Sequence, residues 1–329
     1  MSPEATASWK RAVPGLVISV GALALVFALS DTTALWDALR RMPARTWLTA
    51  AGLLALSLAL RAAAWQRLLG QRVSWPDAFW ALDAGYLVNN VIPFRAGEAT
   101  RALLIAPKAG VSFWYALSTV LVERLLDVIM LAGMLVSTLP WVLDLPWARR
   151  TSWGFGGAAL AALLALMFAA RHREAIATRI APWQEAQAGW KRTLARWLTA
   201  FLNGLDALTH PAALAAVVGL MALSWSAQVV AYWLTLRALV PQASMLWAAF
   251  ALGSVGMGIA VPSAPGGVGV MEGVIVFVLG ALGVEASVAL AYALVMHGVY
   301  YLVTGILGWI GVTVYGVAWS DLLAQARGQ

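Results

Sequence analysis

The chain of 329 residues contains no cysteine and only three histidines. The absence of cysteine excludes disulfide bonds and thiol chemistry, and it leaves the cellular compartment undecided. Charged residues make up only 11% of the sequence, whereas hydrophobic residues make up 62%, and the mean hydropathy is +0.79. These proportions are far from those of a soluble domain. They indicate a chain that folds in lipid.

Apolar runs recur along the chain, each about 18 to 28 residues long, which is enough for a helix to cross a bilayer. We therefore predict an all-helical, polytopic membrane protein with a single membrane domain over residues 1–329. Full spans are expected at about 13–30, 46–69, 112–139, 152–170, 211–236 and 286–312, with the apolar tail to Trp319 as a candidate seventh. The first run is longer than the apolar part of a signal peptide, so we interpret it as an uncleaved span.

Two further apolar regions, 78–108 and 245–283, are interrupted near their middle by proline and glycine. The first contains Pro93 and Gly97, and the second contains the run PSAPGGVGVMEG from Pro262 to Gly273. Such breaks free backbone polar groups that lipid cannot satisfy, so they persist only where they face protein or a wet cavity. We predict a re-entrant hairpin in each region.

The two interrupted regions resemble each other. When Gly110 is placed on Gly283, Glu98 falls beside Glu272 and Arg124 falls on His297. Three membrane crossings separate the two copies, and an odd number makes them run in opposite directions. We predict inverted halves, about 46–170 and 211–319, joined by a linker at 171–210. This plan is typical of transporters that expose one central site to each leaflet in turn.

The net charge of +7 comes from cations spread over the loops, so we expect no nucleic-acid partner. The linker is the longest polar stretch and is rich in arginine, which places it and the N-terminus in the cytoplasm of a bacterial inner-membrane protein. Within it, Trp183, Trp190 and Trp197 recur every seven residues. They predict an amphipathic helix that either lies in the headgroup layer or packs on its neighbours.

Charged residues gather in and after the first interrupted region. In the stretch NNVIPFRAGEATR, a helix beginning after Pro93 would place Arg95, Glu98 and Arg101 along one side. The next span contains Glu123, Arg124 and Asp127 near its middle, where Glu123 and Asp127 share a face at i,i+4 and Arg124 reaches Asp127 at i,i+3. Each charge costs about 2.5–3.5 kcal/mol at the centre of an inserted helix, so none of the six can face lipid. Their charges sum to zero, and we expect a buried network that either binds a ligand or fastens the hairpin to this span.

Phosphate is the ligand that these groups suit best. Arginine binds phosphate oxygens in a bidentate way, and a helix start adds free amide groups. Both are expected after Pro93, and amides again at Pro265-Gly266-Gly267-Val268-Gly269, unless these glycines serve close packing. Glu272 could then receive an ammonium, a sugar hydroxyl or an arginine. His297 is either a proton-coupling group or a hydrogen-bonded core histidine beside two tyrosines.

Three motifs in order, NxxPxRxGExxR from Asn90, ERxxD from Glu123 and PGGxGxxE from Pro265, resemble the flippase-like membrane family. This family includes the transmembrane region of bacterial lysylphosphatidylglycerol synthase and the YbhN-like and hopanoid-associated membrane proteins. The resemblance implies a module that moves the headgroup of a phospholipid, glycolipid or hopanoid-type lipid between leaflets. The residues that it implies for the headgroup cavity are Asn90, Pro93, Arg95, Gly97, Glu98, Arg101, Glu123, Arg124, Asp127, Pro265, Gly266, Gly267, Gly269, Glu272 and His297.

Other functions stay open on the sequence alone. No soluble aminoacyltransferase domain follows the membrane region, so we expect transport rather than enzymatic activity, without a cofactor or metal ion. The alternatives are an intramembrane enzyme on lipid substrates and a non-transporting partner of a lipid synthase or glycosyltransferase. The lipid, the energy source and the oligomeric state, including a homo-oligomer, are left undetermined.

Overall fold

The computed structural model describes residues 19–92, 95–142, 167–184, 189–205, 209–258 and 264–316, with isolated positions between 154 and 165. These parts of the chain form helices and no strand. Four of the described helices are long and apolar enough to cross a membrane. They are α3 (Ala44–Leu68), α6 (Phe113–Val142), α10 (Pro211–Leu239) and α13 (Ala286–Val314). They match four of the predicted spans, and the all-helical membrane class is confirmed.

Within the first predicted span, 13–30, the described residues form a helix at Ser19–Ala28, which then bends by 93° into α2 (Thr32–Arg41). The Asp31 carboxylate accepts the amide hydrogens of Thr33 and Ala34, which caps the start of α2 beside the bend. The predicted span at 152–170 lies mostly outside the described residues. Helix α13 ends at Val314, and the rest of the tail predicted as a candidate seventh span lies mostly outside the described residues.

The first interrupted region folds as a helical hairpin of α4 (Trp75–Val91) and α5 (Ala96–Ala109). The two helices touch at Gly85 and Gly97, where a Cβ on Gly97 would lie 1.9 Å from the Gly85 carbonyl oxygen. An ion pair between Asp77 and Lys108 joins the beginning of α4 to the end of α5. The break predicted near Pro93 is therefore the turn of a tightly packed hairpin.

The second interrupted region consists of α11 (Met245–Gly258), the 3-10 turn η2 (Pro265–Gly267) and α12 (Val270–Gly280). Helix α11 packs on α6, where a Cβ on Gly253 would lie 3.1 Å from the Leu135 backbone. In the same way α13 packs on α4, where a Cβ on Gly311 would lie 2.4 Å from the Trp80 carbonyl oxygen. Glycine thus permits close helix contact at both crossings.

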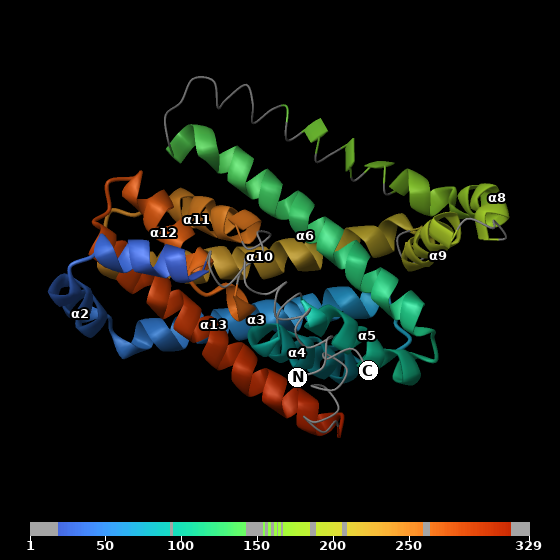
Figure 1. Ribbon diagram of the computed structural model, residues 1–329, viewed down its shortest axis with the longest axis horizontal. Helices are drawn as coiled ribbons and strands as arrows, with labels where there is room; N and C mark the ends of the chain where they lie inside the picture. Colours follow the sequence, from blue (N-terminus) through green and yellow to red (C-terminus); the bar gives the residue numbers. More distant parts are fainter. Residues whose placement is uncertain are drawn as a thin grey trace.

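The packing of the two halves is reciprocal. Helix α3 lies along α10, and the hydroxyls of Ser57 and Ser224 are 2.8 Å apart between them. The first hairpin packs on α13 of the second half, and α11 packs on α6 of the first half. In Figure 1, α4 and α5 lie toward the end of the molecule that carries α8 and α9, whereas α11 and α12 lie toward α2 at the other end.

The linker forms two helices instead of the single helix that was predicted. They are α8 (Arg173–Gln184), which carries Trp183, and α9 (Gly189–Gly204), which carries Trp190 and Trp197. All three indole side chains are exposed. Helix α9 also packs on α6, and the ring of Trp197 meets Trp114 edge-on at 5.5 Å. The predicted packing on a neighbouring helix is therefore observed for α9, and the position in the headgroup layer stays a prediction.

Candidate functional site

Seven charged side chains, joined by ion pairs, form a network between α3, α5 and α6, which we call the ion-pair network. Six of them were predicted from the sequence, and the seventh comes from α3. The members are Arg61, Arg95, Glu98, Arg101, Glu123, Arg124 and Asp127. Among the described residues the network has four cations and three anions, where the sequence predicted three of each.

Arg61 lies at the centre of the network, and the sequence analysis missed it. Its Nη1 is 3.0 Å from Glu123 Oε1 and 2.6 Å from Asp127 Oδ2. The guanidinium also lies over the ring of Trp225 on α10, 5.2 Å from its centroid. A lone arginine well inside an apolar span was itself the available signal, because an isolated charge there requires a partner.

Glu123 and Asp127 share one face of α6, as their spacing predicted. Glu123 is fully buried, and its second oxygen pairs with Arg101 Nη1 at 2.9 Å. Asp127 binds Arg124 at 3.2 Å, which confirms the predicted pairing, and accepts a hydrogen bond from the Trp225 indole at 3.1 Å. Buried carboxylates are tolerated only when paired and hydrogen-bonded, and both are.

The start of α5 differs from the prediction. The helix begins at Ala96, and Arg95 precedes it in the left-handed region with φ 53° instead of standing on the helix with Glu98. Arg95 Nη1 lies 3.6 Å from Glu98 Oε1, and the Arg95 side chain is 49% exposed. The Gly97 amide, expected to be free, donates to Asn89 Oδ1 at 2.8 Å. Pro93 lies outside the described residues.

Arg101 and Arg124 have unused hydrogen-bond donors. Arg101 pairs with Glu123 and lies over the Trp65 ring at 4.9 Å, whereas its Nε and Nη2 have no hydrogen-bond partner among the described residues. Arg124 Nε also has no hydrogen-bond partner among the described residues, and it lies 3.9 Å from Glu98 Oε1. Buried donors are rarely left without an acceptor, so these groups point to a polar guest.

A small pocket adjoins these donors. It is lined by Leu82, Gly85, Tyr86, Asn89, Gly97, Glu98, Arg101 and Arg124. Its volume is about 10 Å³, which is room for about one water molecule. The side chains of Arg124 and Glu98 remain 26% and 20% exposed, so the network reaches the surface along this side.

In the second half, Glu272 and His297 bind each other. Glu272 Oε1 is 2.5 Å from His297 Nδ1, and Oε2 accepts the Gly269 amide at 2.7 Å. Glu272 therefore does not receive an arginine from the other half. His297 Nε2 faces the Gly266 carbonyl oxygen at 3.1 Å. The histidine is a buried, hydrogen-bonded group beside Tyr301, as one of the two interpretations predicted.

The glycines of the second interruption contact the chain itself. A Cβ on Gly266 would lie 1.7 Å from the Tyr301 hydroxyl, and one on Gly269 would lie 2.2 Å from the Ser19 carbonyl oxygen. Gly266, Gly267 and Gly269 all have positive φ, which favours glycine. The Tyr301 hydroxyl donates to the Pro265 carbonyl oxygen at 3.1 Å. Of the two predicted roles, a ligand site and close packing, these glycines therefore show close packing.

Polar and aromatic side chains connect the two halves. Asn90 donates to Thr304 on α13 at 2.8 Å, which is a helix-to-helix contact. Tyr86, which lines the small pocket, meets Tyr300 edge-on at 6.5 Å, and Tyr300 meets Tyr301 beside His297. A continuous aromatic path thus runs from the ion-pair network to the Glu272–His297 pair. The sequence motifs contained no indication of Tyr86.

A comparison with protein families identifies the class to which the chain belongs. Residues 13–308 match the lysylphosphatidylglycerol synthase TM region, and the chain belongs to this family. A comparison with curated proteins gave no match. The family is a membrane domain of lysylphosphatidylglycerol synthase-like proteins, so the chain is a multi-pass membrane protein with a lipid-related function.

Proposed function

We propose that the protein moves a lipid with a phosphate-bearing headgroup between the two leaflets of a bacterial inner membrane. The observation that carries this proposal is the set of buried guanidinium donors on Arg101 and Arg124 that have no hydrogen-bond partner among the described residues. An anionic phosphodiester would offer charged acceptors to them, and a neutral sugar or sterol-like headgroup would not. No covalent bond of the lipid changes in such a step, so the activity is transport.

The chemistry of the unused donors supports the same ligand. Arg101 Nε and Nη2 and Arg124 Nε are hydrogen-bond donors on guanidinium groups, and guanidinium groups match phosphate oxygens. The pairs that these arginines already make with Glu98 and Glu123 hold the guanidinium groups in place. The same carboxylates compete with the phosphate for them, which allows the headgroup to leave again.

Access to the network requires a conformational change. The small pocket holds about one water molecule, so the described arrangement corresponds to the closed form of the site. The reciprocal packing of the halves supports an inverted repeat with re-entrant hairpins entering from opposite sides. Rocking of one half against the other would open the network to each leaflet in turn. The acyl chains would stay in lipid while only the headgroup crosses.

Arg95 and Glu98 form the outer edge of the site in this mechanism. Arg95 is half-exposed and sits at the tip of the first hairpin, so it is placed to meet a headgroup first. Arg124, one ion pair further in, is placed to meet it next. We place the N-terminus and the linker helices α8 and α9 on the cytoplasmic side, because cations concentrate there.

The proposal is tested in liposomes that contain the purified protein and a fluorescent phospholipid whose outer-leaflet copies can be bleached chemically. We expect Arg124→Gln and Arg95→Gln to slow the loss of protected fluorescence by about tenfold or more, the effect of one lost charge-assisted hydrogen bond. Arg45→Gln is the matched control, because Arg45 is exposed at the start of α3 and outside the network.

Two results decide the outcome. Normal transport by Arg45→Gln, together with slow transport by folded Arg124→Gln, supports the proposal. Parent-like transport by both network variants, with unchanged thermal unfolding, overturns it. A glycolipid without phosphate should move more slowly than a phospholipid in the parent protein, and equal rates would contradict the role of phosphate recognition.

A further inference from the structure

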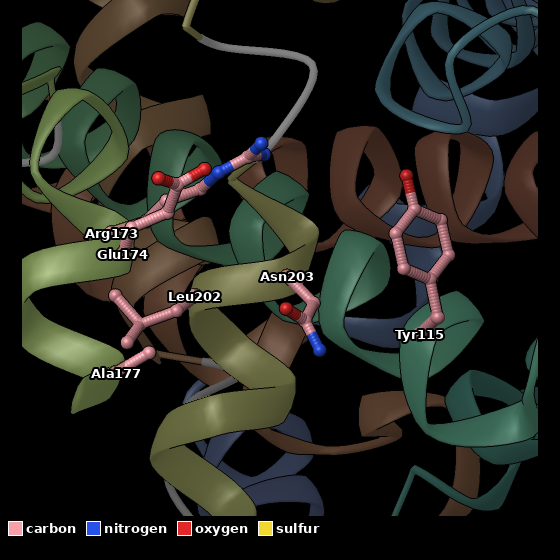
Figure 2. A pocket seen from close by; sticks show the side chains of 6 residues that line it. All are labelled: Tyr115, Arg173, Glu174, Ala177, Leu202 and Asn203. Carbon is pink, nitrogen blue, oxygen red and sulfur yellow. The ribbon is translucent and has the colours of Figure 1, made fainter. Parts of the chain in front are cut away.

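A second pocket lies at the end of the molecule formed by α8, α9 and the beginning of α6, away from the ion-pair network. Its lining residues are Tyr115, Arg173, Glu174, Ala177, Leu202 and Asn203. Figure 2 shows Tyr115 across the opening from Asn203 and Leu202, with Arg173 and Glu174 side by side on α8. The volume is about 320 Å³, within the range of small-molecule sites and far larger than the pocket in the network.

The lining combines one cation, one anion, a phenol and a carboxamide over an apolar floor. Leu202 and Ala177 form the apolar part, with Leu202 buried. Arg72 adds a second cation beside the pocket, its guanidinium 5.8 Å from the Tyr115 ring centroid. Groups of both signs at one opening fit a ligand that carries both charges.

The surroundings of the pocket indicate the depth of the headgroup layer. Trp114, next to Tyr115, is 50% exposed, and Trp197 on α9 touches it and is 45% exposed. Exposed tryptophans concentrate where the bilayer meets water. The first hairpin opens toward this same end of the molecule, where Asp77 pairs with Lys108.

We propose that this pocket binds a phosphodiester that carries an ammonium group, as in a zwitterionic phospholipid headgroup. Arg173 and the Tyr115 hydroxyl would bind the phosphate oxygens, and Glu174 would bind the ammonium. The Asn203 carboxamide would form a hydrogen bond with either the phosphate or the ammonium group. The site is distinct from the ion-pair network, and its test does not depend on transport.

The lack of cysteine in the chain makes a local test simple. Asn203→Cys and Ala177→Cys each place one thiol in the pocket, and Thr178→Cys places one on an exposed position of α8 outside it. The rate at which a polar thiol reagent modifies each protein in detergent is measured with increasing dihexanoyl-phosphatidylethanolamine. We expect saturable slowing at positions 203 and 177 and none at 178.

Substitutions of the charged residues identify the chemistry. In the Ala177→Cys protein, Arg173→Ala should weaken protection about tenfold, the value of one charge-assisted hydrogen bond, and Glu174→Gln should weaken it less. Arg179→Ala, on the same helix outside the lining, should leave protection unchanged. The proposal is overturned if the lipid slows thiol modification at neither pocket cysteine. It is also overturned if the same slowing persists in both Arg173→Ala and Glu174→Gln.

A soluble phosphodiester distinguishes the source of the ligand. Glycerophosphoethanolamine has the same charged groups without acyl chains. Weaker protection by this compound than by the lipid supports a membrane headgroup. Equal protection supports the same site chemistry and assigns a soluble ester as its ligand.

Discussion

Arg61 on α3 and Glu123 on α6 form an ion pair of 3.0 Å, with side chains that are 3% and 0% exposed. This pair joins the first long helix of one half to the span that follows its hairpin. Arg61 also pairs with Asp127, so two carboxylates share one guanidinium. Removing this charge takes a partner from both carboxylates, which keep Arg101 and Arg124 as their remaining cations.

The first prediction concerns Arg61. Arg61→Leu should lower the free energy of unfolding by about 1–3 kcal/mol, because Glu123 and Asp127 each lose one hydrogen-bonded cation but keep Arg101 or Arg124. The double variant Arg61→Leu, Asp127→Leu should lose less than Arg61→Leu alone, because one of the two carboxylates that lost a partner is also removed. Denaturant unfolding in detergent measures both. A double variant less stable than the single variant would contradict this account.

The second prediction concerns the contact between α4 and α5. Gly97→Ala would place a methyl group 1.9 Å from the Gly85 carbonyl oxygen, so the hairpin must open or shift. We expect a loss of about 1–3 kcal/mol in stability, as for other overpacked sites. Gly133→Ala is the control, because a Cβ there meets nothing within 4 Å, and helix propensity favours alanine. Thermal unfolding of the two variants should shift in opposite directions.

The third prediction concerns the hydrogen bond between Glu272 and His297. His297 Nδ1 is 2.5 Å from Glu272 Oε1 and Nε2 is 3.1 Å from the Gly266 carbonyl oxygen, so the ring joins the carboxylate to the turn η2. His297→Phe should cost about 1–3 kcal/mol, because it removes a hydrogen-bond partner of the buried carboxylate. His297→Gln, which retains a hydrogen-bond donor, should cost less. Equal losses in a denaturant titration would contradict the role of this hydrogen bond.

The fourth prediction is a pH dependence at the exposed end of the first hairpin. Hydrogen bonds from Lys108 and then Ser74 hold the pKa of Asp77 below its usual 3.8. A lowered pKa in the folded state stabilises the protein above the unfolded pKa and loses this effect as the pH falls through the folded value. Lys108→Met should therefore destabilise the protein by less than about 1 kcal/mol at pH 7, as expected for an exposed pair. The difference between the two proteins should shrink toward pH 3, and a difference that grows would exclude this cause.

The sequence predicted the long helices well, because uninterrupted apolar runs leave few alternatives in lipid. It also predicted the shared face of Glu123 and Asp127, because that spacing is a property of the helix. Arg61 was missed because it stands alone in an apolar run, outside any motif. Close packing was one of the two roles predicted for Gly266, but its partner Tyr301 could not be predicted, because Tyr301 approaches from a distant helix.

Arg95 shows a different limit of sequence reasoning. Its spacing to Glu98 predicted a helical pair, and the two side chains do pair, but from a left-handed residue that precedes the helix. The three-residue spacing thus predicted the ion-pair partner of Arg95 but not the backbone conformation of Arg95. Local conformation next to a proline depends on how the surrounding helices close the hairpin, and this information is not local.

The reciprocal packing of the hairpins has a consequence for how the protein is made. Helix α4 rests on α13, which is the last described helix to leave the ribosome, and α11 rests on α6, which was inserted long before it. The first hairpin is therefore synthesised long before its final neighbour. Premature termination before α13 would leave uncovered the face of α4 on which Gly308 and Gly311 of α13 normally rest.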